Sequence, residues 1–166
     1  MARVISDAGP LIALAKVDSL FIARELFSRL WIPEAVWLEC REKADEDSCR
    51  IERAANEGWL NVVSVTTSPP LPRSLGRGEV EAIQLALGTA DALLIVDDRL
   101  ARREATRHGL TYIGTARMLH LAERRSIVDS AEDVVQRVAE CGYRISPLLL
   151  QQLRARNSDE LPPPAE

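Results

Sequence analysis

Residues 92–96 form an uninterrupted run of five apolar side chains, most of them aliphatic or β-branched. Such a run is typical of a strand that is buried on both faces of a parallel sheet. It ends in Asp97 and Asp98, and a helix-like pattern follows over 99–108. Because ligands of open α/β sheets bind at the carboxyl ends of the strands, these two acids are either helix caps or part of a site.

Short apolar segments that suit strands alternate along the chain with amphipathic segments that suit helices. The predicted strands are 3–7, 30–32, 60–65, 92–96 and 110–113. The predicted helices are 11–16, 20–26, 34–42, 51–56, 79–87, 99–108, 115–125, 130–140 and 146–156, with the polar residues 43–50 as a loop or a solvated helix end. This alternation predicts an α/β fold, a three-layer α/β/α sandwich with a central parallel sheet.

The 166 residues carry no internal repeat and suit one domain over 3–156, with the proline-rich residues 157–166 as a disordered tail. No apolar run approaches the roughly 20 residues of a membrane span, and the N-terminus lacks the pattern of a signal peptide. Three cysteines without motif spacing fit a reducing compartment. We therefore expect a cytoplasmic protein without membrane contact. A net charge of −4 argues against broad, non-specific coating of nucleic acid.

Acidic residues recur where a parallel fold would place its open end. Asp7 follows the first strand, Asp97 and Asp98 follow the fourth, Glu39 lies within a helix, and Glu79 begins another. With only two histidines, carboxylates are the abundant metal ligands, and pairs of divalent cations about 4 Å apart hold phosphodiesters and activate water. Each acid also has an ordinary explanation, as a turn residue, a solvated helix face or a first-turn acid that the helix dipole favours.

Four segments in order resemble the PIN domain, and most of all the branch that resembles the toxin nucleases of prokaryotic toxin–antitoxin pairs. They are ISDAGPLIALAK at 5–16, IPEAVWLE at 32–39, GEVEAIQLA at 78–86 and VDDRLARR at 96–103. Segments 109–115 and 141–146 are similar to the same branch, so that the resemblance extends from about residue 3 to residue 155.

The resemblance implies a single-strand endoribonuclease that depends on Mg²⁺ or Mn²⁺, with RNA as substrate and an antitoxin as partner. Carried over by position, the catalytic acids are Asp7, Glu39, Glu79 and Asp97, and the metal ligands are Asp7, Asp97, Asp98 and Glu79. Two positions stay open. Glu81 is an alternative to Glu79 because a two-residue shift still fits the motif, and Asp98 is an alternative or an addition to Asp97.

Position 9 departs from the pattern of the PIN domains that this chain resembles, which often have Ser or Thr where this chain has Gly9. The hydroxyl of that position is therefore either missing or supplied by Ser6. Three cationic side chains, Lys16, Arg99 and Arg102, are expected to contact substrate phosphates. Arg102 has an ordinary explanation as well, as part of a solvated helix face or as the partner of a nearby acid.

Two further functions are compatible with an α/β domain of this kind. One is a PIN-fold interaction domain that is catalytically weak or inactive. The other is a phosphoacceptor regulatory domain, which needs an acidic pair after the first strand and a Lys after a late one. It is disfavoured because the pair follows the fourth strand and Gly114 and Thr115 follow the last. A homodimer is expected because terminal amphipathic helices leave apolar surface to cover and twofold dimers are the commonest solution. The resemblance points the same way.

Overall fold

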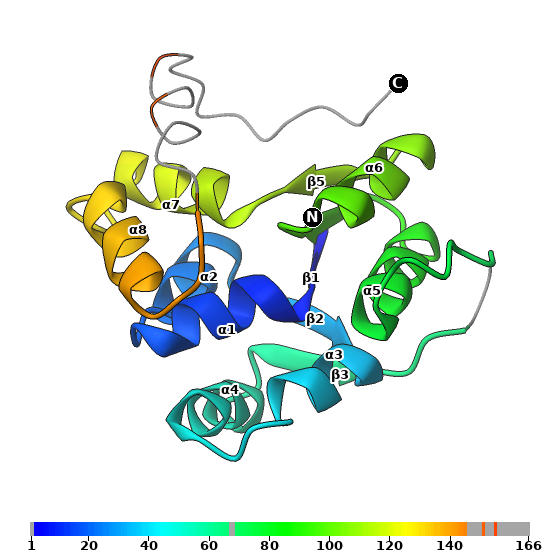
Figure 1. Ribbon diagram of the computed structural model, residues 1–166, viewed down its shortest axis with the longest axis horizontal. Helices are drawn as coiled ribbons and strands as arrows, with labels where there is room; N and C mark the ends of the chain where they lie inside the picture. The colour runs from blue at the N-terminus through cyan, green and yellow to red at the C-terminus, as the bar shows by residue number, and fades with distance from the viewer. Residues whose placement is uncertain (1, 67–68, 146–150, 152–154, 156–166) are drawn as a thin grey trace.

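The computed structural model describes residues 2–66, 69–145, 151 and 155. Five strands form one parallel sheet in the order β3-β2-β1-β4-β5 (Figure 1). Their bounds are β1 (Arg3–Ser6), β2 (Leu30–Pro33), β3 (Leu60–Val63), β4 (Ala92–Ile95) and β5 (Thr111–Ile113). The predicted α/β/α sandwich with a central parallel sheet is confirmed. Within the described ranges, none of the helices combines the length and the apolar character that a bilayer crossing requires.

Eight helices surround the sheet in the described part of the chain. They are α1 (Ala8–Lys16), α2 (Phe21–Phe27), α3 (Glu34–Cys40), α4 (Glu46–Asn56), α5 (Arg77–Leu87), α6 (Arg99–Arg107), α7 (Thr115–Arg124) and α8 (Ala131–Glu140). Helix α5 packs across β1, β2 and β4 and contacts α6, whereas α1 contacts α4 and α8, and α7 contacts α2 and α8. Helix α3 contacts both α1 and α5 and so joins the two helical layers.

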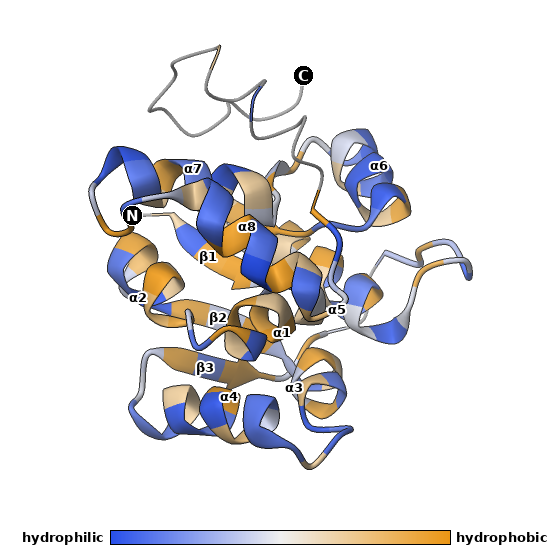
Figure 2. Cartoon of the chain, turned by 60° about the vertical axis from the view of Figure 1, so that its left-hand side comes forward, coloured by the Kyte–Doolittle hydropathy of each residue, from blue (hydrophilic) through white to orange (hydrophobic). Residues whose placement is uncertain are grey.

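The central strands are apolar because both of their faces are covered. Ile5 of β1 and Leu94 of β4 are completely buried, and Figure 2 shows the apolar strands enclosed between the helices. This double burial explains the uninterrupted apolar run over 92–96.

The direction of the strand order reverses between β1 and β4, which lie side by side in the middle of the sheet. Ser6 pairs with Ile95 at the carboxyl ends of the two strands, and the Asp7 amide donates to the Ile95 carbonyl oxygen at 3.0 Å. Chains that leave β1 and β4 therefore diverge from a common point. In doubly wound sheets this point is where a crevice opens.

One predicted boundary is wrong, because the helix expected from residue 51 begins earlier, at Glu46. The second part of the polar stretch 43–50 is thus a solvated helix end, one of the two states expected for it. Helix α4 begins at Glu46, after Asp45, whose carboxylate accepts a hydrogen bond from the Ser48 amide at 3.0 Å. Arg50 pairs with Glu46 one turn away, at 2.8 Å. A cap and an ion pair thus stabilise a helical turn that lacks the apolar pattern of a helix. The predicted helix over 146–156 and tail over 157–166 lie outside the described residues, apart from isolated positions.

Candidate functional site

Six acids line one cleft at the carboxyl ends of β1 and β4. The cleft has a volume of about 660 Å³, and its acidic side chains are Asp7, Glu39, Glu42, Glu79, Asp97 and Asp98. Gly9 and Ile12 of α1 and Tyr143 complete its wall together with Ala8. The topology explains this gathering, since α1 and α6 begin at the two strand ends and α3 and α5 contact each other beside them.

Asp7 is the most deeply buried of these acids, with 7% of its surface exposed. Its Oδ1 atom has no hydrogen-bond partner among the described residues. Burial raises the pKa of Asp7 to about 7, an effect that the Ala8 amide opposes and that the charges of Glu79, Glu39 and Asp97 reinforce. An acid of this kind is held in a costly environment by the rest of the fold.

Asp97 is held by four hydrogen-bond donors. Its Oδ1 accepts from the Thr115 amide at 2.8 Å and from Nη2 of Arg102 at 3.2 Å. Its Oδ2 accepts from the Thr115 hydroxyl at 2.6 Å and from the Tyr143 hydroxyl at 2.5 Å. Since a carboxylate offers about four acceptor positions, these donors hold Asp97 in one orientation, and a cation at Asp97 would take the place of one of them.

Asp98 is both a helix cap and a cleft residue. Its Oδ1 accepts a hydrogen bond from the Ala101 amide at 2.9 Å, which caps the N-terminus of α6. The side chain is exposed and lines the cleft beside Asp97. The sequence allowed the acids after β4 to be either helix caps or part of a site, and Asp98 is both.

Glu39 and Glu79 are anchored at the N-terminus of α5. Glu39 Oε1 accepts from the Gly78 amide at 2.8 Å, and Glu79 Oε2 accepts from the Gly76 amide at 2.8 Å. A Cβ atom at position 78 would lie 2.6 Å from the same Glu39 oxygen, so glycine is needed there for close approach. Burial raises the pKa of Glu79, against the Gly76 amide and with support from the charges of Asp98 and Glu39.

Glu81 points away from the cleft. Its Oε2 accepts from the Ala35 amide at the start of α3 at 3.0 Å, and its Oε1 pairs with Arg77 at 3.3 Å. Of the two acids that the motif left open, Glu79 is the one that lines the cleft.

The matching family is described as PIN domain (DUF3368), and its profile covers residues 3–159 of this chain. The chain belongs to the PIN domain family. The resemblance of the four segments to the PIN domain is thereby confirmed, and PIN domains are generally nucleases that use divalent metal ions.

Two further comparisons accompany the family assignment. A PilT N-terminus domain protein from the hyperthermophilic archaeon Sulfolobus solfataricus P2 is similar in structure, with 17% identity and a TM-score of 0.45, over 69% of this chain and 88% of that one. A search of curated proteins gives no match.

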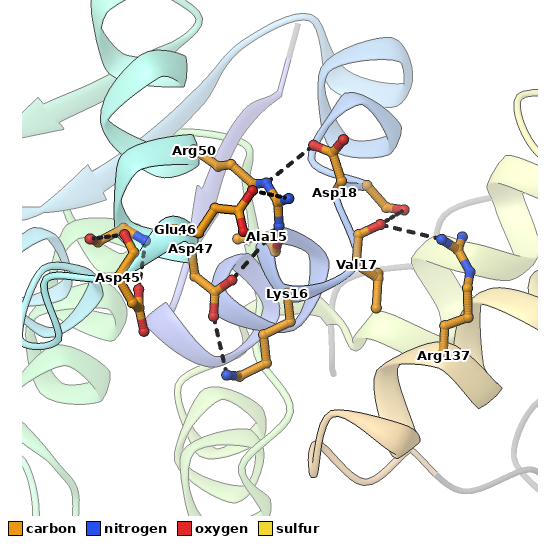
Figure 3. A network of polar contacts seen from close by, with 11 residues as sticks. Ala15, Lys16, Val17, Asp18, Asp45, Glu46, Asp47, Arg50 and Arg137 are labelled. Carbon is orange, nitrogen blue, oxygen red and sulfur yellow. Dashed lines mark hydrogen bonds and ion pairs between the residues drawn. The ribbon is translucent and has the colours of Figure 1, made fainter.

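The predicted phosphate-binding cations of this PIN domain lie in different surroundings. Lys16 pairs with Asp47 at 3.1 Å (Figure 3) and does not line the cleft. Arg102 is engaged with Asp97, and its Nε also donates to the Val96 carbonyl oxygen at 2.9 Å. Arg99 is exposed at the start of α6, next to the cleft residue Asp98.

Three residues of the site were missed in the sequence. Glu42 and Tyr143 line the cleft, and Thr115 is buried behind Asp97, to which it donates. Thr115 directly follows β5 and Gly114, so the rule that strand ends meet at one edge would have placed it near Asp97. Tyr143 comes from the segment after α8, and no local pattern indicates that this segment returns to the cleft. Ser6 does not supply a cleft hydroxyl, because its side chain is fully buried and donates to the Asp7 carbonyl oxygen at 2.9 Å.

The oxygen donors of the cleft suit a hard divalent cation in kind. The buried Oδ1 of Asp7, which has no partner in the described part of the chain, is an acceptor that such a cation would satisfy. Among the described residues, no three potential ligands lie close enough together to hold an ion. The acids of the cleft are therefore spaced more widely than the ligands of an occupied metal site. Cys40 is buried near Asp7 and Glu39, and burial, reinforced by their charges, raises the pKa of its thiol to about 12, which makes it a poor ligand.

Proposed function

We propose that this PIN domain is a metal-dependent endoribonuclease that cleaves single-stranded RNA and is the toxin of a toxin–antitoxin pair. The environment of Asp7 is the observation that best supports this proposal. Asp7 is a buried carboxylate among other acids in an open cleft, and one of its oxygens has no partner in the described chain. Retaining such a group costs free energy. A structural acid in the same place would be expected to have an internal cation or a full set of donors.

The residues proposed to hold Mg²⁺ or Mn²⁺ are Asp7, Asp97, Asp98 and Glu79. A divalent cation bound there would neutralise phosphate charge and lower the pKa of a bound water. Thr115 and Arg102 keep the Asp97 carboxylate in one orientation. Glu39 keeps the N-terminus of α5, and with it Glu79, beside the cleft.

Arg99 is the side chain that we propose for contact with a substrate phosphate, since it is exposed and adjacent to Asp98. Lys16 and Arg102 already have acidic partners, so a phosphate would have to compete with Asp47 or Asp97 for them.

Cleavage of labelled single-stranded RNA with Mg²⁺ or Mn²⁺ tests this function, with EDTA as control and single-stranded DNA and duplex RNA of the same sequence as comparison substrates. We expect metal-dependent cuts within the single-stranded RNA alone. Intact RNA under all metal conditions, from a folded protein, would contradict the nuclease and favour the non-catalytic interaction domain.

The toxin role requires an antitoxin that holds the nuclease in check. An Arg or Lys side chain of that partner could pair with Asp7, Glu79 and Asp97 in place of the metal, and desolvated pairs of this kind contribute strongly to binding. Metal and antitoxin would then weaken each other's binding by the same factor. The test is the antitoxin's affinity over a Mn²⁺ series at constant ionic strength, with the product of an adjacent small open reading frame as the candidate. An affinity independent of Mn²⁺ would contradict occupation of the cleft.

The homodimer and the cytoplasmic location stay predictions. Light scattering at micromolar concentration tests the dimer, and a monomeric mass would contradict it. The phosphoacceptor alternative has no support from the family assignment.

A further inference from the structure

Tyr143 reaches the acidic cleft from a distant part of the chain. Its hydroxyl donates to Oδ2 of Asp97 at 2.5 Å, and the residue lines the cleft next to Gly9 of α1. Burial, together with the charge of Asp97, raises the pKa of Tyr143 well above its usual range, so the hydroxyl stays protonated and acts as a donor. Two of the four donors to Asp97 are thus hydroxyls, one from Thr115 and one from Tyr143.

Gly9 makes room for this hydroxyl. A Cβ atom at position 9 would lie 2.9 Å from the Tyr143 Oη atom, nearer than real Cβ atoms come to a neighbour. Gly9 lies within α1 and is not among the residues of positive φ, so its backbone would accept any residue in conformational terms. The requirement for glycine is therefore one of space.

We propose that Tyr143 is a positioning residue of the cleft that orients Asp97, and that Gly9 is present because it leaves the space that the Tyr143 hydroxyl occupies. If this is so, the hydroxyl that Tyr143 supplies could be supplied from position 9 instead. A serine at position 9, combined with removal of the Tyr143 hydroxyl, would bring another hydroxyl to almost the same place. The effect on metal binding rests on the proposed function, whereas the steric coupling of positions 9 and 143 does not.

The size of the effect follows from the role of groups that orient metal ligands. Loss of such a group typically lowers metal affinity or activity by about 10- to 100-fold. The lower end, about tenfold, is expected for Tyr143→Phe because the three donors from Thr115 and Arg102 remain on Asp97.

The experiment compares four variants with the wild type: Tyr143→Phe, Gly9→Ala, Gly9→Ala with Tyr143→Phe, and Gly9→Ser with Tyr143→Phe. The readouts are Mn²⁺ affinity by calorimetry and the unfolding midpoint in EDTA. Tyr143→Phe should weaken Mn²⁺ binding about tenfold. Adding Gly9→Ser should restore most of the affinity, whereas adding Gly9→Ala should not. Tyr112→Phe is the matched control, because the Tyr112 hydroxyl contacts Thr106 outside the cleft at 3.3 Å, and it should bind Mn²⁺ as the wild type does.

Mn²⁺ affinity in Tyr143→Phe equal to that of the wild type, or higher, would overturn the positioning role, and so would equal rescue by Ala and Ser at position 9. In EDTA, Gly9→Ala should lower the unfolding midpoint of the wild type and leave that of Tyr143→Phe unchanged or slightly raised, since alanine is the better helix former. Equal shifts in the two backgrounds would overturn the steric coupling. A wild type that neither binds Mn²⁺ nor cleaves RNA would refute the proposed function. The EDTA comparison would then still decide the coupling of Gly9 and Tyr143.

Discussion

Two acid-rich regions of this molecule differ in how far their carboxylates are paired with cationic side chains. At the junction of α1 and α4, the acids have cationic partners (Figure 3). Asp47 pairs with Lys16 at 3.1 Å, and Arg50 pairs with Glu46 at 2.8 Å and with Asp18 at 3.4 Å. Arg50 also donates to the Ala15 carbonyl oxygen at 2.7 Å, which ties α4 to the end of α1.

In the cleft, one ion pair, between Arg102 and Asp97, is formed within the described chain. Glu39 and Glu79 accept from backbone amides, and Oδ1 of Asp7 has no partner among the described residues. The contrast shows that acids with a structural role in this protein have cationic partners within the chain. Acids that are buried together without enough cationic partners are best explained by a bound ligand such as a metal ion.

The largest effect is expected from Asp7→Asn, which removes a charge from the cleft and keeps the volume. Metal-dependent RNA cleavage should fall by at least about 100-fold, the upper value for loss of a group that merely supports a ligand. The stability in EDTA should stay the same or rise slightly, since a repulsive charge is gone. Initial cleavage rates and thermal unfolding of the same samples measure both.

Asp47→Asn is the matched control for that change, at an acid that has its cations nearby. It should keep the cleavage rate and lower stability by up to about 1 kcal/mol. If Asp7→Asn lost the most stability and Asp47→Asn the most activity, the assignment of the two regions would be reversed.

The pH dependence of stability separates the two regions next. The pKa of Asp7 is about 7 in the folded protein, above its ordinary value of 3.8. Between these two values the folded state keeps a proton that the unfolded state loses. The stability that Asp7 contributes in this way is fully present below about pH 4 and is lost as the pH rises through about 7. From this group alone, the free energy of unfolding falls with pH by at most about 1.4 kcal/mol per unit.

Denaturant unfolding in EDTA between pH 5 and pH 8 measures this slope. We expect Asp7→Asn to gain stability relative to the wild type as the pH rises, whereas Asp47→Asn should not. Parallel curves for the wild type and Asp7→Asn would show that Asp7 ionises as an ordinary carboxyl.

A smaller effect is expected at the centre of the paired region. Arg50→Ala removes a hydrogen bond to Ala15 and the pairs with Glu46 and Asp18. Because the Arg50 side chain is 22% exposed, the loss should be about 1–2 kcal/mol of stability. Cleavage at a temperature where the variant is folded should be unchanged, and a tenfold loss of rate there would connect this junction to the cleft.

The smallest effect is expected for Asp18→Asn. The Asp18 side chain is 81% exposed and pairs with Arg50 at 3.4 Å, so solvent screens most of the interaction. Its φ of 51° suits asparagine as well as aspartate. Stability should change by less than about 0.5 kcal/mol, as a chemical denaturation midpoint would show.

The sequence predicted the sheet because buried parallel strands carry a simple pattern, and the strand ends placed Asp7 and Asp97 at one edge. The choice between Glu79 and Glu81 could not be made in the same way. Residues two apart on a helix face different directions, and which of them meets the cleft depends on how α5 packs.

Two other features depended on interactions that no local pattern records. The start of α4 at Glu46 comes from a cap and an ion pair in a polar stretch. Tyr143 enters the cleft because the chain after α8 folds back over α1, and its closeness to Asp97 joins positions 46 residues apart. The reason for Gly9 became visible only with Tyr143 in place.

The most direct test of the contrast between the two regions is a Mn²⁺ titration by calorimetry at pH 7.5 on the wild type, Asp7→Asn and Asp47→Asn. The cleft should bind Mn²⁺ in the wild type and in Asp47→Asn with the same affinity, and Asp7→Asn should lose that binding. Equal Mn²⁺ affinity in the wild type and Asp7→Asn would contradict the claim that Asp7, whose Oδ1 has no partner among the described residues, is there to hold a metal ion.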